Sequence, residues 1–406
     1  MATVLDYFDW RGDIPFSCDP FGDVDNVALS ELVYIDFAGV VPEKPGNEIP
    51  LPEALSILFG RWEGRDLSLG AFISPSVFEL TKKMAVSPRF GRTKLTAFRN
   101  ICREEEEECG QLQWSAVTAL FEDETLFIAF RGTDDTLISW KEDLHMAILE
   151  EIPSQRGAVG YVDEILDAYP GYKVRIGGHS KGGNLAVYAA AKCKPEHRER
   201  IVAVYDNDGP GFSEGFLADA GYREIRDRVR DILPEESFVG LLLCHDLPQI
   251  VVKSKNKSLF QHDLFSWEVE RNSFVRAPAL SETALAAERT VKNWLAEMTQ
   301  EETRDFVNAL YKILTYGNAR TLSDLSGGKL SLFHAYRKLD PEGRALVADT
   351  LRKLLEENSR TVYRTVRTNV ENAVNSVSRS EKKSSAPRSV EQMNGSSLYK
   401  PGKKKK

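Results

Sequence analysis

The sequence predicts an α/β fold, with a mostly parallel central sheet flanked by helices, followed by a C-terminal helical module and a disordered tail. Three observations support this fold class. Apolar strands and amphipathic helices alternate over residues 111–275, as a parallel sheet requires. A strand runs through a glycine-rich turn into an alanine-rich helix at residues 173–194. From Ser281 onward the pattern changes to long helical faces.

The first predicted segment, residues 1–275, begins with a lead-in of helices and loops that has few strand signals. Apolar residues at helical spacing predict helices at 28–37 and 75–84. The strands expected after this lead-in are, in chain order, 112–121, 126–130, 173–176, 201–205 and 249–252, with a candidate final strand at 266–274 and a helix at 159–169.

The second and third segments lie beyond this sheet. Residues 276–374 are predicted to form a helical module, with faces at 282–312 and 341–358 and a weaker, polar helix at 360–374. Residues 375–406 are rich in Ser, Lys, Arg and Asn and are predicted to be a disordered basic tail. Such a tail either solubilises the chain or makes transient contact with an anionic membrane.

Composition is that of a soluble globular protein, because 42% of the 406 residues are hydrophobic and 28% are charged. We expect no transmembrane helix, since no apolar run reaches about 18 residues. The N-terminus carries acid and no basic region, so we expect no signal peptide. Five cysteines without a C-x-x-C pair indicate reduced thiols in the cytoplasm.

Charge is spread unevenly along the chain. The net charge is -8, the tail from Asn375 onward carries +7, and the rest of the chain therefore carries -15. An acidic body disfavours nucleic acid as a ligand. The glutamate run at 104–108 lacks interleaved ligands, so it is interpreted as a solvated segment and not a metal site. We expect no metal and no organic cofactor. The sequence does not indicate an oligomeric state.

The strongest functional signal is Gly178-His-Ser-Lys-Gly182, which fits the G-x-S-x-G pattern of a nucleophile elbow. A sharp strand-to-helix turn holds the serine in a strained backbone conformation, and side chains at 178 and 182 would collide with neighbouring backbone. The helix that follows has its N-terminus at Ser180, where its free N–H groups and dipole stabilise an anion. Ser180 is therefore the predicted nucleophile.

An upstream motif adds a resemblance to a known family. Phe130-Arg-Gly-Thr133, followed by Ser139-Trp140 and Asp143-Leu144, resembles the oxyanion loop of the class 3 lipases. The elbow is similar to the G-H-S-L-G-G of the same family, with Lys181 standing where that family has leucine. The resemblance implies an α/β-hydrolase fold and the activity of a serine esterase.

The chain also resembles a bacterial, lipase-like family of unknown function. This resemblance covers about residues 1–275 and suggests a fold and a mechanism but no substrate. It rests on four segments: Asp25-Asn-Val-Ala-Leu-Ser-Glu-Leu-Val-Tyr-Ile-Asp-Phe37, Asp208-Gly-Pro-Gly-Phe212, Ser237-Phe-Val-Gly240 and Gln261-His-Asp263.

A serine nucleophile needs a base to take its proton. In α/β-hydrolases the chain order is Ser, acid, His, which leaves His245 and His262 as the main candidates. His262 is favoured because a flexible loop after strand 249–252 lets it reach the elbow. His179, inside the elbow, is expected to be a packing residue.

The acid partner is less sharply defined. Asp206 and Asp208 directly follow strand 201–205, whereas class 3 lipases place the acid one strand later, near Glu235 and Glu236. Asp208 is favoured because Asp-Gly-Pro-Gly-Phe matches the lipase-like family. The alternative for Asp208 is an Asx turn before Gly209.

The oxyanion hole is predicted to consist of the backbone N–H groups of Thr133 and Lys181, with the Thr133 hydroxyl as a possible third donor. Arg131 is expected to hold the loop through an internal ion pair, and Asp143 to anchor it. The Lys181 side chain either biases the site towards anionic or polar substrates or points to solvent.

Together these residues predict a cytoplasmic serine hydrolase that cleaves a carboxylic ester, of the esterase or lipase type, through an acyl-enzyme intermediate. The expected substrate is a small-molecule acyl or lipid ester. Two rival functions stay open. One is a catalytically inactive hydrolase-fold scaffold that acts through its helical module and tail. The other is a membrane-surface phospholipase.

Overall fold

The structure is a computed structural model that describes residues 1–64, 73–103, 112–134, 136–146, 149–315, 337–339, 341–350 and 352–353. Its centre is an eight-stranded sheet whose strands lie in chain order, from β1 to β8. The strands are β1 (Ile49–Pro50), β2 (Lys94–Arg103), β3 (Leu112–Leu120), β4 (Thr125–Phe130), β5 (Lys173–His179), β6 (Ile201–Asn207), β7 (Val229–Pro234) and β8 (Ile250–Val252). Strands β4 to β8 are parallel, and the pairs from β1 to β4 are antiparallel.

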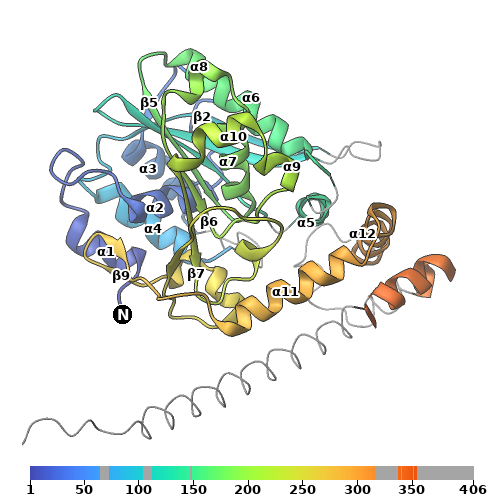
Figure 1. The fold of residues 1–406 in the computed structure, drawn as a ribbon. Helices are drawn as coiled ribbons and strands as arrows, with labels where there is room; N and C mark the ends of the chain where they lie inside the picture. Colours follow the sequence, from blue (N-terminus) through green and yellow to red (C-terminus); the bar gives the residue numbers. More distant parts are fainter. Residues whose placement is uncertain are drawn as a thin grey trace, which may run out of the picture. The chain divides into compact units, whose positions relative to one another are not determined.

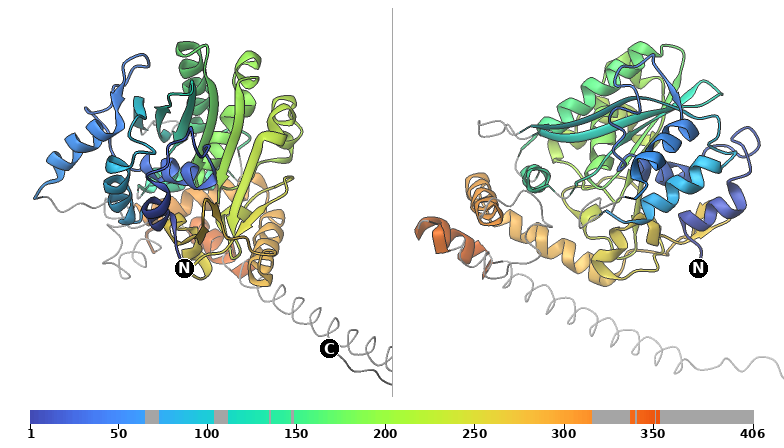
Figure 2. Two further views of the ribbon diagram at one scale, coloured as in Figure 1. Left: turned by 90° about the vertical axis from the view of Figure 1, so that its left-hand side faces the viewer. Right: turned by 180° about the vertical axis from the view of Figure 1, so that it is seen from behind.

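Helices cover both faces of this sheet (Figures 1 and 2). One face carries α1 (Val4–Arg11), α2 (Asp23–Leu32), α3 (Leu51–Trp62) and α4 (Ser76–Val86). The other carries α6 (Pro153–Ala168), α7 (Lys181–Lys192) and α10 (Ala220–Ile225), with the short helices α8 (Pro195–Arg198) and α9 (Glu214–Leu217) nearby. Helix α5 (Leu137–His145) follows the loop after β4.

The side chains of β4 show why this layered arrangement is stable. Phe127 and Ala129 pack in the cluster with α1–α4, whereas Leu126, Ile128 and Phe130 pack in the cluster with α6 and α7. All five are at most 2% exposed. A strand buried on both faces needs apolar residues throughout, and β4 has them.

The end of the described chain is helical. Helix α11 (Glu282–Ala296) packs Ala284 against Leu233 and Leu241, and α12 (Gln300–Leu314) lies against α5. The described residues all lie in one compact unit, residues 1–358. The predicted boundary at residue 275 stays a prediction, and the predicted helix at 360–374 and tail at 375–406 lie outside the described residues. No described helix is both long enough and apolar enough to cross a membrane.

The predicted α/β fold with a mostly parallel sheet flanked by helices is confirmed, and five predicted strands match β3, β4, β5, β6 and β8. The expectation of few strands before residue 111 was wrong, because β2 is a ten-residue strand. A register shift between Thr96 and Arg99, with Ala97 at φ +55°, breaks its alternation. Strand β7 was also missed, since Arg230 and Asp231 interrupt its apolar residues.

Other boundaries moved. The helix predicted at 28–37 is α2, which begins at Asp23, where the Asp25 side chain accepts a hydrogen bond from the N–H of Gly22. The single helical face predicted over 282–312 is two helices, with the cap of Thr299 starting the second. The strand predicted at 266–274 is the small hairpin of β9 (Val269–Glu270) and β10 (Ser273–Phe274).

Candidate active site

The carboxyl ends of the parallel strands carry all the predicted site residues. Thr133 lies after β4, Ser180 after β5, Asp208 after β6 and His262 after β8. Parallel neighbours end at the same edge of a sheet, which is where ligand sites of α/β folds form. The register pairs His179 with Asn207, so the next residues, Ser180 and Asp208, lie side by side at the ends of two adjacent strands.

Ser180 occupies a strained turn between β5 and α7. Its φ is +56° and its ψ is -130°, an unusual conformation for a residue with a side chain. A Cβ at Gly178 would lie 2.3 Å from the carbonyl carbon of Gly182, and one at Gly182 would lie 2.2 Å from the carbonyl oxygen of Phe130. The predicted reason for both glycines is confirmed, since any side chain there would collide with backbone.

Asp208 and His262 meet beside this turn. Asp208 Oδ2 lies 2.7 Å from His262 Nδ1, and the Asp208 side chain is fully buried while that of His262 is 29% exposed. The second carboxyl oxygen, Oδ1, accepts hydrogen bonds from the Ser237 hydroxyl and from the Gly240 N–H at 3.2 Å. Three neighbouring groups therefore hold the Asp208 carboxyl in place. The bond to Nδ1 fixes the imidazole ring and leaves Nε2 for another partner.

The alternative residues Asp206 and His245 belong to a different cluster. Asp206 Oδ1 accepts a hydrogen bond from the Gly209 N–H, and burial together with the neighbouring Asp231 raises the pKa of Asp206 well above its usual range. His245 Nε2 lies 3.1 Å from the carbonyl oxygen of Leu242, and its Nδ1 lies 3.5 Å from Asp231 Oδ2. Within the described chain, Asp206 is therefore not hydrogen-bonded to His262, and His245 is not hydrogen-bonded to Asp208.

Glu235 and Glu236, the other candidates for the acid, lie on the loop after β7. The Glu236 carboxylate accepts hydrogen bonds from the N–H of Ser258 and from the Gln261 side chain, so it supports the turn that carries His262. Glu235 forms a backbone hydrogen bond to Val252. Within the described chain, neither carboxylate is hydrogen-bonded to a histidine.

The predicted oxyanion loop lies directly against the nucleophile. A Cβ at Gly132 would be 3.2 Å from Ser180 Cβ and 2.4 Å from the carbonyl oxygen of His179. Among the described residues, the backbone N–H groups of Thr133 and Lys181 have no hydrogen-bond partner, and their role as oxyanion donors stays a prediction. The Thr133 hydroxyl instead donates to Asp143 Oδ2, and the expectation that it serves as a third donor was wrong for this arrangement.

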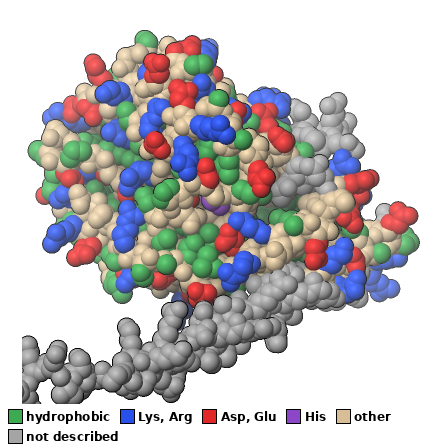
Figure 3. Space-filling view, in the orientation of Figure 1, with side chains coloured by type: hydrophobic (Ala, Val, Ile, Leu, Met, Phe, Trp, Pro, Cys, Tyr) green, Lys and Arg blue, Asp and Glu red, His purple; other side chains and the backbone are tan. Residues whose placement is uncertain are grey.

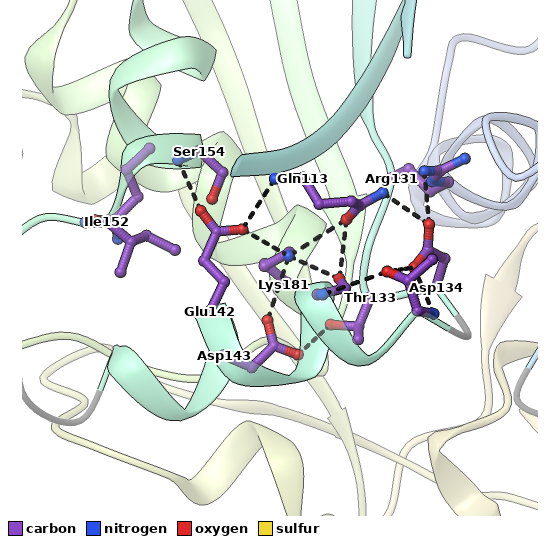
Figure 4. A network of polar contacts seen from close by, with 12 residues as sticks. Gln113, Arg131, Thr133, Asp134, Glu142, Asp143, Ile152, Ser154 and Lys181 are labelled. Atoms are coloured by element: carbon purple, nitrogen blue, oxygen red, sulfur yellow. Dashed lines mark hydrogen bonds and ion pairs between the residues drawn. The ribbon is translucent and has the colours of Figure 1, made fainter. Parts of the chain in front are cut away.

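Lys181 corrects a second expectation. Its side chain is only 1% exposed, so it neither points to solvent nor faces a substrate (Figure 4). The ammonium group lies 2.9 Å from Ser139 Oγ and 3.2 Å from Glu142 Oε2. Burial alone would lower the pKa of Lys181, but Asp143 and Glu142 outweigh it and raise the pKa. Arg131 forms the predicted ion pair, at 3.0 Å to Asp134.

A second pair of carboxyl and imidazole groups, not predicted from the sequence, lies behind the nucleophile. Glu31 Oε1 on α2 is 3.1 Å from His179 Nδ1, which is also 3.3 Å from the Tyr34 hydroxyl. Burial raises the pKa of Glu31 to about 8 and lowers the pKa of His179 to about 3, so the two groups meet as neutral partners at pH 7. The His179 and His262 rings are 4.5 Å apart between centroids. A glutamate inside the buried face of a predicted helix was the signal available in the sequence.

The contact between the predicted nucleophile and the predicted base is not formed in this structure. No hydrogen bond connects the Ser180 hydroxyl to His262 in the described chain. Such bonds are often long in ligand-free enzymes and shorten in the complex with substrate. Ser180 is 9% exposed, and its hydroxyl is not committed to any other described group.

The surface around His262 is apolar. Leu259 and Phe260, in the same 3₁₀ turn as His262, are 60% and 77% exposed, and Phe238, on the loop that holds Asp208, is 37% exposed. On the face shown in Figure 3, histidine surface lies in a hollow with hydrophobic side chains beside it. Across the described residues, no group of three His, Cys, Asp or Glu side chains could hold a metal ion.

Comparison with known proteins gives a family and a distant structural likeness. The Mbeg1-like family model matches residues 84–312, which is more than half of the chain. No curated protein matches the sequence.

Three solved lipase structures illustrate the likeness. A fungal lipase-inhibitor complex is 15% identical, with 61% of this chain and 78% of that chain covered and a TM-score of 0.32. The Lip2 lipase from Yarrowia lipolytica is 11% identical, with 58% and 80% covered and a TM-score of 0.33. A mutant form of MDLA from Penicillium cyclopium is 12% identical, with 64% and 86% covered and a TM-score of 0.34.

Proposed function

We propose that this chain, which belongs to the Mbeg1-like family, is a serine hydrolase that cleaves a carboxylic ester with an apolar acyl or lipid group. The observation that carries the proposal is the 2.7 Å contact between Asp208 and His262 beside the strained turn at Ser180. A nucleophile, a base and an oriented acid in this arrangement are the parts of an acyl-transfer site.

In the proposed reaction, Ser180 Oγ attacks the ester carbonyl while His262 Nε2 takes the hydroxyl proton. Asp208 keeps the His262 proton on Nδ1 and stabilises the imidazolium that forms. The N–H groups of Thr133 and Lys181 donate to the oxyanion. His262 then returns the proton to the leaving alcohol, and water activated by the same histidine releases the acyl group.

The apolar side chains beside the site favour an apolar acyl chain. Leu259 and Phe260 are exposed and lie three and two residues before His262 in the same turn. Contact with an acyl chain removes this apolar surface from water, which favours binding by roughly 25 cal/mol per Å² of apolar surface buried. A polar or charged acyl group gains nothing from this surface.

The proposal is tested by hydrolysis of p-nitrophenyl esters of rising chain length. The wild-type protein is expected to turn them over and to prefer longer chains, and Ser180→Ala is expected to be inactive. If folded wild-type protein hydrolyses none of these esters, the catalytically inactive scaffold is the better explanation.

The apolar surface has its own test with a matched control. Leu259→Ser combined with Phe260→Ser is expected to lower kcat/KM for long-chain esters by about 30-fold, because each of the two lost apolar contacts costs on the order of 1 kcal/mol. Short-chain esters are expected to be less affected. The control is Val86→Ser, since Val86 is 81% exposed on α4 and outside the site. Equal losses for both chain lengths would contradict an acyl-binding role.

A further inference from the structure

The buried ammonium of Lys181 has a position that the proposed reaction does not explain. Lys181 follows the nucleophile directly and supplies a predicted oxyanion donor from its backbone, while its side chain turns into the interior. Four groups surround the ammonium: Ser139 Oγ at 2.9 Å, Glu142 Oε2 at 3.2 Å, Gln113 Oε1 at 3.4 Å and Asp143 Oδ1 at 3.4 Å. These groups come from β3 and from α5, the helix after the oxyanion loop.

One carboxylate joins the residues of both oxyanion donors. Asp143 Oδ1 lies 3.4 Å from the Lys181 ammonium, and Asp143 Oδ2 accepts the Thr133 hydroxyl (Figure 4). The two residues whose backbone N–H groups face the oxyanion therefore meet through their side chains on a single carboxylate. Burial raises the pKa of Asp143, and the Lys181 ammonium opposes that effect, so the lysine favours the ionised carboxylate.

The other partners of the lysine are held in turn. Glu142 Oε1 accepts the Ser154 N–H at 3.0 Å, and Glu142 Oε2 accepts the Gln113 N–H at 3.4 Å. The Gln113 side-chain amide donates to Asp134 at 2.9 Å, and Asp134 pairs with Arg131. The network thus ties the whole loop from 131 to 134 to the start of α7, as Figure 4 shows.

We propose that Lys181 is a positioning residue that holds the oxyanion loop against the nucleophile elbow and keeps the oxyanion hole formed before substrate binds. This inference rests on the proposed serine hydrolase function. An oxyanion hole works only if its donors lie about 2.7–3.1 Å from the oxyanion. A leucine at this position cannot pair with a carboxylate, so the buried Glu142 and the partly buried Asp143 would be left without this cation.

The rival explanation is that Lys181 forms a buried ion pair of purely structural value. The chain offers a matched pair for comparison, since Arg89 and Asp25 are bonded at 2.7 Å with 0% and 1% of their side chains exposed. That pair lies in the layer of α1–α4, away from the oxyanion loop. Both pairs are expected to contribute to stability, and only Lys181 is expected to affect turnover.

The experiment compares two double variants that each remove one positive and one negative charge. Lys181→Met with Glu142→Gln leaves the net charge unchanged, so no unpaired Glu142 carboxylate remains buried. It also keeps the hydrogen bond from Thr133 to Asp143. Arg89→Met with Asp25→Asn is the control. For each protein, kcat and KM for p-nitrophenyl butyrate and the inhibition constant of an alkyl trifluoromethyl ketone are measured per folded molecule. The Ser180 hydroxyl is expected to add to the carbonyl carbon of that ketone, which places an oxyanion in the oxyanion hole.

We expect the Lys181 double variant to lose kcat on the order of 10²-fold, as when one oxyanion donor is lost. KM is expected to change little, and the ketone to bind more weakly by a factor similar to the loss of kcat. The control is expected to keep both constants. If the Lys181 double variant keeps kcat and ketone affinity, or loses no more than the control, the inference is wrong. If the wild-type protein neither hydrolyses the ester nor binds the ketone, the proposed function fails first and the inference with it.

Discussion

The two carboxyl–imidazole pairs of this protein lie on either side of one contact between histidine rings, yet their carboxyl groups differ in the hydrogen bonds that they accept. Asp208 and His262 are 2.7 Å apart, and Glu31 and His179 are 3.1 Å apart. The Asp208 carboxylate also accepts hydrogen bonds from Ser237 and Gly240, whereas Glu31 Oε1 has no hydrogen-bond partner among the described residues.

The difference teaches that residue type does not decide which pair can act as acid and base. A buried carboxyl keeps its proton when nothing stabilises the charge, and burial raises the pKa of Glu31 to about 8 for this reason. A buried imidazole likewise stays neutral, and the pKa of His179 falls to about 3. His262 differs from His179 in being partly exposed and in lying 2.7 Å from a carboxyl group that accepts further hydrogen bonds.

The sharpest way to break this comparison is to remove the carboxylate from each pair. Asp208→Asn is expected to lower kcat by about 10⁴-fold, because the amide no longer holds the tautomer and cannot stabilise the imidazolium. Glu31→Gln is expected to lower kcat by less than about tenfold, since a neutral side chain replaces a neutral one. Both are measured with the same p-nitrophenyl ester. A loss of kcat in Glu31→Gln as large as in Asp208→Asn would show that the Glu31–His179 pair takes part in proton transfer.

A smaller effect is expected from the hydroxyl that supports Asp208. Ser237→Ala removes a hydrogen bond to the Asp208 carboxylate and is expected to lower kcat by about 10- to 100-fold, since a bond to a charged group is worth roughly 1.5–3 kcal/mol. The control is Ser30→Ala, because Ser30 is fully buried next to Glu31 and bonds to Asn26. Ser30→Ala is expected to lower stability without a comparable loss of kcat. Equal losses of kcat in both variants would mean that packing, and not support of Asp208, explains them.

The smallest effect concerns stability against pH. The pKa of Glu31 is raised from 4.5 to about 8, so its contribution to stability is complete below pH 4.5 and is lost as pH rises towards 8, at about 1.4 kcal/mol per pH unit. The pKa of His179 is lowered from 6.5 to about 3, so its contribution rises with pH over that range and offsets Glu31 up to pH 6.5. Between pH 6.5 and 8 only the loss from Glu31 remains, about 2 kcal/mol.

Urea unfolding of wild type and Glu31→Gln across this range measures the effect. The variant is expected to lose less stability than wild type between pH 6.5 and 8, and the two proteins to have parallel pH dependence below pH 4. Identical pH dependence of the two proteins between pH 6.5 and 8 would contradict a neutral, buried Glu31.

The fold and the Asp208–His262 pair could be predicted from patterns in the sequence. Buried parallel strands such as β4 are continuous apolar runs, and the glycines at 178 and 182 mark the turn around Ser180. His262 was favoured because a flexible loop lets it reach the elbow, and Asp208 because Asp-Gly-Pro-Gly-Phe resembles a lipase-like family. The structure brings these two side chains together at 2.7 Å.

The rest depended on where charged side chains point, which the sequence does not encode locally. Lys181 is buried only because Glu142 and Asp143, nearly 40 residues away, supply its partners. Glu31 was missed because helix α2 is buried from Val24 to Leu32, and a protonated glutamate can occupy such a position. Strand β2 escaped detection because its bulge at Ala97 removes the period of two on which strand prediction depends.

The most direct measurement is mass mapping of the protein after treatment with a fluorophosphonate probe, in wild type and in His262→Ala. The structure predicts a single adduct on the peptide that contains Ser180, and its loss or strong slowing in His262→Ala, because the serine is nucleophilic only with its base. An unlabelled Ser180 in folded wild-type protein, or labelling that proceeds equally without His262, would contradict the proposed catalytic site.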